Sequence, residues 1–257
     1  MDKLTIIKVG GKVVEEPELL EQFLKSFSVI AGAKMLVHGG GRSATRLAEK
    51  LGVESKMVNG RRITDEETLK IVTMVYGGLV NKNIVAQLQK RGIDALGLTG
   101  ADMNTIRSVK RPVEDIDYGF VGDVREVDGR LLSDLIQQCV VPVMAPLTHD
   151  GEGNILNTNA DTIAGEVAKA MALHYDVRLI FCFEKKGVLM DENDDNSVIS
   201  LITPDLFNEY KEQGIIQGGM IPKLENAFDS VRAGVKEVII TQASDIHLGK
   251  GTTIRLQ

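Results

Sequence analysis

Residues 4–12, with the sequence LTIIKVGGK, indicate the fold class of this chain. The first six form a short apolar run typical of parallel strands that are covered on both faces. Lys8 interrupts the run, and a charge is costly there unless it emerges at the carboxyl end of the strand, where open α/β sheets bind ligands. Gly10 and Gly11 then allow a sharp turn and a close approach of the backbone to a ligand. The stretch therefore predicts a strand that ends in an anion-binding loop.

A second glycine loop follows another apolar run. Residues 35–38 lead directly into Gly39, Gly40 and Gly41, ahead of a helical pattern at 43–51. The free N–H groups and the positive dipole end of a helix favour an anion at such a point. Neither loop matches the P-loop pattern G-x-x-x-x-G-K-[ST] or the dinucleotide pattern G-x-G-x-x-G. Two such loops on neighbouring strands predict an anion cradle, and Lys8 indicates phosphate chemistry.

Strand-like and helical patterns alternate along the rest of the chain. Further apolar runs occupy 95–98, 140–145, 177–183 and 237–241, and helical patterns occupy 17–31, 65–89, 162–173, 204–212 and 222–233. This alternation favours an α/β fold with a mostly parallel sheet and helices on both faces. Residues 103–133 break the alternation, since two short strand patterns there precede the turn signal Asp128-Gly129. They predict a β-hairpin insertion at one edge of the core.

Composition limits the classes of function. The chain has 257 residues, a net charge of -6, no Trp and 4% aromatic residues. A nucleic-acid surface usually needs a basic face and stacking aromatics, so no nucleic-acid partner is expected. No apolar stretch approaches the roughly 20 residues of a membrane span, and the chain passes straight into its first strand without a signal-peptide pattern. We expect a cytoplasmic protein without a membrane partner, in which Cys139 and Cys182 are buried reduced thiols.

Two later segments add polar groups with a candidate role in binding. Residues 154–162, NILNTNADT, place three amides and a carboxylate ahead of a helix. One of them is expected to act only as a helix cap, while the others can bind carboxylates or orient lysines. Residues 214–223, GIIQGGMIPK, deliver Lys223 into the first turn of a helix. The helix dipole disfavours a cation at that point, and an anionic ligand would reverse this penalty.

Taken together, these segments resemble the amino acid kinase family along essentially the whole chain. Within the family the motifs are most similar to members that phosphorylate N-acetyl-L-glutamate. The resemblance implies an open αβα sandwich with an N-terminal lobe, 1–172, that binds the acylated glutamate and forms a homodimer, and a C-terminal lobe, 173–257, that binds ATP. The matching motifs are K-V-G-G at 8–11, V-H-G-G-G at 37–41, N-G-R-R-I-T-D at 59–65, V-N-K-N at 80–83, G-L-T-G-A-D at 97–102, Y-G-F-V-G-D-V at 118–124, N-T-N-A-D-T at 157–162 and G-G-M-I-P-K at 218–223.

The resemblance also implies a reaction and roles for individual residues. The γ-phosphoryl group of ATP, with Mg2+, passes to the γ-carboxylate of N-acetyl-L-glutamate, the second step of arginine biosynthesis. No tightly bound cofactor and no metal-ligating side chains are implied. Lys8 and Lys223 flank the transferred group and Asp161 orients both of them. The implied phosphate cradle is Gly10, Gly11 and Gly40; the substrate-binding residues are Gly40, Gly41, Arg62, Asn157 and Asn159; the nucleotide-binding residues are Gly187, Gly214, Gly218, Gly219 and Met220.

The chain departs from the family pattern at three places. Arg42 stands where relatives carry a small or apolar residue, and Arg61 stands where Leu is usual. We hypothesise that one of these arginines pairs with a second carboxylate, as in an N-succinyl rather than an N-acetyl substrate; the alternative is that both are surface residues. Residues 181–187, FCFEKKG, replace a Thr/Ser-Asp-Val sequence, although Gly187 is kept. A non-catalytic member that only binds nucleotide or amino acid is a further alternative, and the presence of Lys8, Asp161 and Lys223 argues against it.

Overall fold

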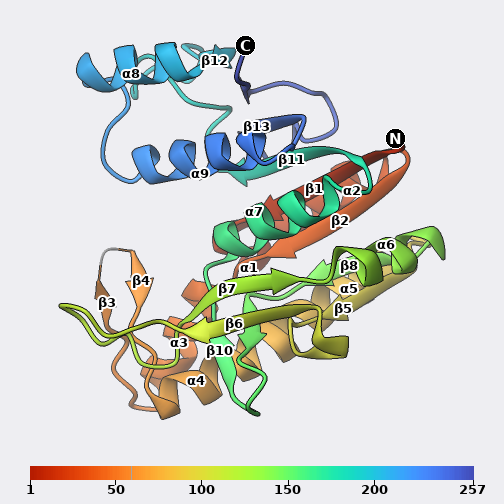
Figure 1. The fold of residues 1–257 in the computed structure, drawn as a ribbon, viewed down its shortest axis with the longest axis vertical. Coiled ribbons are helices and arrows are strands. Elements are labelled where there is room, and N and C mark those ends of the chain that lie inside the picture. Colours follow the sequence, from red (N-terminus) through yellow and green to blue (C-terminus); the bar gives the residue numbers. More distant parts are fainter. Residues whose placement is uncertain (59) are drawn as a thin grey trace.

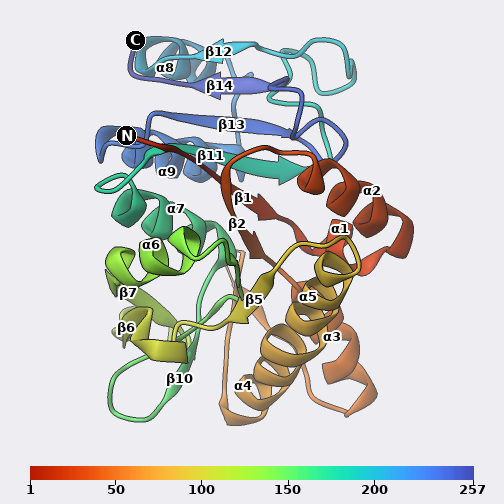
Figure 2. The same cartoon turned by 90° about the vertical axis from the view of Figure 1, so that its right-hand side faces the viewer.

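An eight-stranded sheet forms the centre of the computed structural model, which describes residues 1–58 and 60–257. Asn59, the first residue of the motif at 59–65, lies outside the described residues. The strand order is β12-β14-β13-β11-β1-β2-β8-β5, and only the pairing of β13 with β14 is antiparallel (Figure 2). The mostly parallel α/β sheet predicted from the alternating pattern is thus confirmed. The strands are β1 (Lys3–Val9), β2 (Ala33–His38), β5 (Ala95–Leu98), β8 (Val141–Met144), β11 (Asp176–Phe183), β12 (Leu201–Ile202), β13 (Glu237–Gln242) and β14 (Thr252–Ile254).

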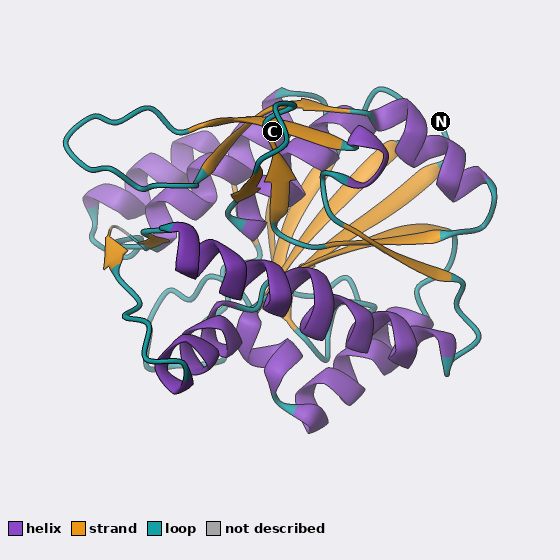
Figure 3. Ribbon diagram, turned by 90° about the horizontal axis from the view of Figure 1, so that it is seen from below, coloured by secondary structure: helices purple, strands orange, loops and turns teal. Residues whose placement is uncertain are grey.

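Helices cover both faces of this sheet and make the three layers of an open αβα sandwich (Figure 3). One layer holds α6 (Gly129–Gln137), α7 (Ala160–Met171), α8 (Pro204–Glu212) and α9 (Met220–Arg232). The other holds α1 (Gly11–Glu15), α2 (Pro17–Ser28), α3 (Gly41–Lys50), α4 (Glu66–Val72), the π-helix η1 (Thr73–Val80) and α5 (Asn81–Gln89). No helix in the described part of the chain is both long and apolar enough to cross a bilayer.

The alternation of side chains along β1 decides where Lys8 lies. Leu4 and Ile6 are fully buried against the layer that contains α7 and α9, whereas Ile7 and Val9 are fully buried against the opposite layer. Because the side-chain period of a strand is two residues, Lys8 shares the face of Leu4 and Ile6. The strand therefore presents this lysine to α7 and α9 at its carboxyl end.

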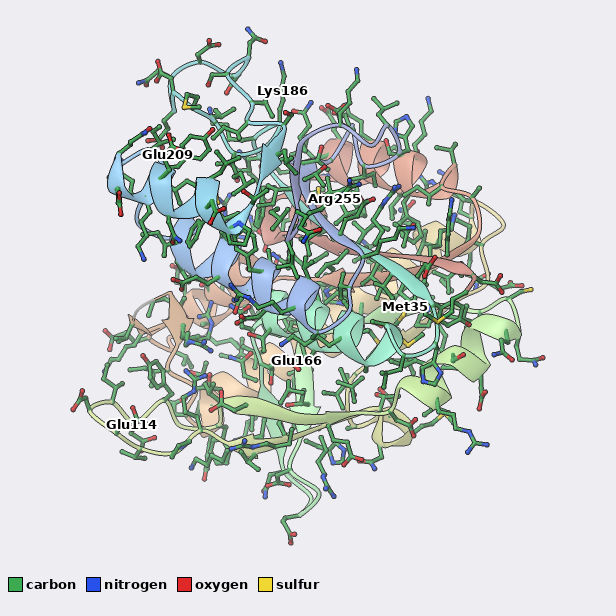
Figure 4. All side chains as sticks on the ribbon, turned by 45° about the horizontal axis from the view of Figure 1, so that its top comes forward. Met35, Glu114, Glu166, Lys186, Glu209 and Arg255 are labelled. Carbon is green, nitrogen blue, oxygen red and sulfur yellow. The ribbon has the colours of Figure 1, made fainter. Side chains whose placement is uncertain are left out.

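The predicted hairpin insertion is present and belongs to a second, four-stranded sheet. Its order is β10-β9-β6-β7, with β6 (Ile106–Lys110) and β7 (Gly122–Val127) antiparallel and a bulge between Arg107 and Ser108. The other two strands are β9 (Leu147–His149) and β10 (Ile155–Asn157), and a separate ribbon pairs β3 (Met57–Val58) with β4 (Arg61–Arg62). The single turn η2 (Asp102–Asn104) precedes β6. Glu114, in the loop between β6 and β7, lies at the opposite end of the molecule from Lys186 (Figure 4).

Two local predictions were wrong. Asp128-Gly129 is not a simple turn: the Asp128 carboxylate accepts a hydrogen bond from the Leu131 N–H at 2.9 Å and begins α6 as its N-cap. The helix expected at 65–89 is confirmed by the continuous helical run of α4, η1 and α5, although its middle part, η1, is a π-helix. Cys182 is buried as expected, but Cys139 is exposed, since it follows the end of α6 with a positive φ of 62°.

Candidate active site

The two glycine loops meet at the carboxyl ends of β1 and β2. The Gly39 N–H donates to the Val9 carbonyl at 3.0 Å, which joins the end of one strand to the loop that follows the other. A Cβ atom at Gly39 would lie 3.2 Å from the Gly11 nitrogen, and one at Gly11 would lie 3.6 Å from the Gly41 nitrogen. The contact at Gly39 is tighter than an ordinary van der Waals contact, whereas the one at Gly11 is ordinary. A larger residue at Gly39 would therefore require the first loop to shift, and glycine there lets the two backbones lie close together.

Two lysines and one carboxylate converge beside these loops. The Lys8 ammonium lies 2.7 Å from Asp161 Oδ1, and Lys8 is only 7% exposed. Asp161 stands in the first turn of α7, where the helix dipole stabilises a negative charge. Lys223 enters from the first turn of α9. Burial lowers the pKa of Lys223, and the charge of Lys8 lowers it further while Asp161 raises it. Residues from β1, α7 and α9 thus form one charge cluster, as the alternation along β1 requires.

A cavity of about 180 Å3 opens on the N-terminal side of the cluster, between the second glycine loop and β10. Arg62 forms part of its wall and is buried, and its guanidinium donates to Ser55 Oγ at 2.8 Å, to the Gly41 carbonyl at 2.9 Å and to Thr45 Oγ1 at 2.8 Å. These bonds hold a cationic group against the glycine loop. The cavity is lined by Gly39, Gly40, Gly41, Met57, Gly60, Arg61, Arg62, Tyr76, Val121, Pro146, Asn157, Thr158, Asn159 and Ala160.

The two candidate asparagines lie on the opposite wall and already have partners. The Asn157 amide donates to Thr64 Oγ1 at 2.9 Å, which fixes its orientation. Asn159 is the N-cap of α7, because its Oδ1 accepts from the backbone N–H groups of Asp161 and Thr162 at 2.8 and 3.2 Å. Its amide nitrogen is the part left to face a ligand.

The arginines that distinguish this chain point to different places. Arg61 lines the cavity beside Arg62. Burial lowers the pKa of Arg61, and the positive charge of Arg111 lowers it further. Arg42 is exposed instead, and its guanidinium lies 3.5 Å from Glu184. The structure therefore brings Arg61 into the same cavity as Arg62 and directs Arg42 toward Glu184.

A second cavity, of about 620 Å3, lies on the C-terminal side of the cluster. Gly187, Gly214 and Met220 line it, as the resemblance implies, whereas Gly218 and Gly219 lie in the turn that leads into α9 and are outside its lining. Its full lining is Phe183, Glu184, Lys185, Gly187, Val188, Leu189, Met190, Asp191, Glu192, Gly214, Ile215, Gln217, Met220, Lys223 and Ile240.

A third cavity, of about 270 Å3, joins the other two. It is lined by both glycine loops and shares Gly41 with the first cavity and Phe183 with the second. Lys12 and Arg42 approach it from the loops, and both contact Glu184, at 3.1 and 3.5 Å. The three cavities form one series that runs from Arg62 to the C-terminal half of the chain. Strand β4, which holds Arg62, and helix α9, which holds Lys223, lie in the lower and upper halves of the ribbon in Figure 1.

Several residues of the site carry no local signal in the sequence. Tyr76, on η1, is buried against Gly40, whose Cβ position lies 3.1 Å from the Tyr76 ring. His38 is fully buried and donates from Nδ1 to the Gly39 carbonyl at 2.8 Å while Nε2 accepts from the Asn81 amide at 3.1 Å. An aromatic or a histidine in an apolar run is usually a core residue, so only the contacts reveal these as supports of the glycine loops.

Lysines and backbone N–H groups gathered beside a series of cavities suit a small-molecule phosphotransferase, because such groups can stabilise a phosphoryl group in transit. The model of the amino acid kinase family matches residues 3–242. The chain is 71% identical to the acetylglutamate kinase of Phocaeicola vulgatus over 254 residues, 99% of each chain, and 41% identical to that of Methanopyrus kandleri over 256 residues, 98% of this chain and 100% of the relative. A solved structure from Streptococcus mutans matches at a TM-score of 0.78 with 30% identity, covering 99% of each chain. The chain belongs to the amino acid kinase family.

Proposed function

We propose that this chain catalyses the ATP-dependent phosphorylation of the γ-carboxylate of N-acetyl-L-glutamate, a step of arginine biosynthesis. One observation carries the proposal: Lys8, Asp161 and Lys223 form one charge cluster between two cavities. Lys223 lines the larger cavity, and Asn159 and Ala160, which precede Asp161, line the cavity that holds Arg62. The names of the full-length relatives agree with this reaction.

The proposed chemistry needs positioning and charge neutralisation rather than a general base. A carboxylate is already ionised at neutral pH, so one of its oxygens can attack the γ-phosphorus directly. The bond from the γ-phosphorus to the β,γ-bridging oxygen breaks, ADP leaves and an acyl phosphate forms, with no net change in protons. Lys8 and Lys223 would stabilise the charge on the transferring group from opposite halves of the chain, and Asp161 would keep both ammonium groups aimed at it.

The glycine loops and the cavity that holds Arg62 would bind the phosphates and the acylated glutamate. Backbone N–H groups of Gly10, Gly11 and Gly40 would complete the phosphate cradle, and Gly41 would contact the substrate. Arg62 would grip the α-carboxylate after exchanging part of its present bonding, with Asn157 and Asn159 on other polar groups. Among residues 1–58 and 60–257, no group of three or more His, Cys, Asp or Glu side chains could hold a metal ion. We propose that Mg2+ enters with ATP, held by phosphate oxygens and water.

ATP would occupy the larger cavity, on the side of Gly187, Gly214 and Met220, with Gly218 and Gly219 giving the loop before α9 its turn. We place the lobe boundary at residue 172, between α7 and β11, and propose a cytoplasmic homodimer formed by the N-terminal lobe. Two features support that contact surface. Strand β5 is an edge of the central sheet. The apolar side chains of Met74 and Leu79 on η1 and of Leu96 on β5 are 53%, 65% and 39% exposed.

The catalytic assignment is tested by Lys8→Ala and Lys223→Ala. Each variant should lower kcat about 100-fold or more while changing KM much less, because the lysines act mainly on the transition state. Trapping the acyl phosphate as a hydroxamate measures the reaction and also excludes a non-catalytic binding protein. Lys169→Ala, on the outer side of α7 where Lys169 pairs with Glu166, is the matched control. Near-normal kcat in both active-site variants would refute the assignment.

A second substrate is favoured by the position of Arg61. This half-buried cation lines the substrate cavity next to a second arginine, and a desolvated carboxylate there would offset the clustered positive charge. We therefore propose N-succinyl-L-glutamate as the alternative substrate, with its extra carboxylate on Arg61. A charge pair of this kind can shift preference by roughly 2–5 kcal/mol.

Kinetics with acetyl-, succinyl- and free glutamate decide between the two substrates. If the succinyl group pairs with Arg61, then Arg61→Leu should raise KM for the succinyl substrate about 30-fold or more and leave the acetyl substrate nearly unaffected. Arg42→Pro is the control, because Arg42 points to Glu184 and away from the cavity. A clear preference for the acetyl substrate that neither variant alters would end the succinyl alternative.

A further inference from the structure

Phe183 is the aromatic residue at which both proposed catalytic lysines meet. Its ring centroid lies 4.1 Å from the Lys223 ammonium and 5.4 Å from the Lys8 ammonium. Both distances are within the roughly 6 Å over which an aromatic ring attracts a cation. We propose that Phe183 is a positioning residue for phosphoryl transfer, whose ring holds the two ammonium groups close together before the nucleotide binds. This inference rests on the proposed function of the site.

Charge balance explains why an aromatic ring suits this position. Lys8 and Lys223 repel one another, and Asp161 supplies a single carboxylate, which is ion-paired with Lys8. A second carboxylate would hold the lysines but would also repel the phosphates of ATP. The negative face of an aromatic ring attracts cations without carrying a net charge. Phe183 can therefore hold the lysines and still release them to a phosphoryl group.

The fold keeps the ring in place. Phe183 ends β11, which lies between β1 and β13 in the middle of the central sheet. The ring stacks on Phe181, with centroids 6.1 Å apart and planes inclined by 14°, and Phe181 is only 4% exposed. Phe183 is itself half-buried and lines both the ATP-sized cavity and the cavity between the glycine loops. A rigid ring at this junction can set the distance between two flexible lysine side chains.

Other charges around the lysines must be considered when the site is titrated. Asp161 on α7 and Lys8 on β1 act directly on Lys223. The remaining charged residues that line the same cavity are Glu184, Lys185, Asp191 and Glu192. Because a ring substitution leaves all of these in place, a change in titration can be assigned to the ring.

The test compares Phe183→Leu, which keeps apolar bulk but removes the ring, with Phe183→Tyr, which keeps the ring. The Leu variant should lower kcat about tenfold with KM for ATP within about threefold. It should also move the alkaline limb of the kcat profile down by about 0.5–1 pH unit, because the ring no longer favours the charged lysine. The Tyr variant should keep both the kcat and the alkaline limb of the unmodified protein. Phe207→Leu is the matched control, since Phe207 lies 5.8 Å from the Lys211 ammonium outside the described cavities of the site.

A volume-preserving series keeps the test decisive if Phe183→Leu folds poorly. Phenylalanines with one, two and three ring fluorines at position 183 weaken the attraction for cations stepwise, so kcat and the alkaline limb should fall with each fluorine. An unchanged alkaline limb across the series, or a Tyr variant as impaired as the Leu variant, would overturn the inference. If the unmodified protein formed no acyl phosphate at all, the proposed function would fail instead.

Discussion

Mild acid should destabilise this protein through one buried histidine. His38 is fully buried at the end of β2, and burial lowers its pKa from 6.5 to about 4. Its two hydrogen bonds, to the Gly39 carbonyl and from the Asn81 amide, suit the neutral ring. Because the folded pKa lies below the unfolded one, the contribution to stability is complete above about pH 6.5 and is lost as the pH falls toward 4. Between pH 7.5 and pH 5 the loss is about 2 kcal/mol, from 1.36 kcal/mol per unit of pKa difference.

Urea unfolding at pH 7.5 and pH 5 measures this loss, and His38→Gln removes its cause. Glutamine is neutral at both pH values and can still accept from Asn81, so the variant should be less stable at pH 7.5 but nearly independent of pH over this interval. His174→Gln controls for the loss of one imidazole at an exposed position. Carboxylates add little, because both pH values lie above their ordinary pKa range. An equal loss of stability in the unmodified protein and in His38→Gln would refute the argument.

Two further predictions concern stability. Burial alone would raise the pKa of Glu237, but hydrogen bonds from Arg255 and Arg178 outweigh it and lower the folded pKa. The stabilisation is therefore lost as the pH falls below about 4.5. In urea unfolding, Glu237→Gln should lower the free energy of unfolding by about 2 kcal/mol at pH 7 and should make it less sensitive to acid below about pH 4.5. Gly119→Ala should destabilise the protein by about 3 kcal/mol or more, because φ is +69° and the new Cβ would lie 2.2 Å from the Thr64 carbonyl oxygen. Gly32→Ala, where φ is +78° but no atom lies within contact distance of the new Cβ, should cost only about 1 kcal/mol. Equal decreases of Tm in the two variants would contradict this steric account.

Much of the fold was predictable because its signals are local. Apolar runs of four to seven residues marked the six longer strands of the central sheet, and the period of the amphipathic patterns marked most of the helices. The short strands β12 and β14 were missed, because two or three residues carry no measurable pattern. The start of α6 at Asp128 was misread as a turn, since Asp-Gly serves both as a turn signal and as a helix entry.

The residues of the candidate site were likewise predictable only in part. Lys8 and the glycine loops were recognisable because a charge or a glycine run is unusual at the end of an apolar strand. Lys223 was recognisable because the helix dipole disfavours a cation in the first turn of a helix. Arg42 and Arg61 looked equivalent in the sequence, and only the packing separated them, since one contacts Glu184 and the other lines the substrate cavity. Phe183 drew notice only as a departure from the family pattern, because its contacts with both lysines arise from three different elements.

The sequence by itself determined the alternation of strands and helices, the position of Lys8 at the carboxyl end of the first strand and the resemblance to a kinase family. These properties depend on periodicities over short stretches of sequence and on motifs that can be recognised without a structure. The tertiary structure alone decided that the ring of Phe183 lies beside both Lys8 and Lys223. The physical reason is strand order: β11 pairs with β1 across more than 160 residues of chain, and no local pattern encodes which strands become neighbours.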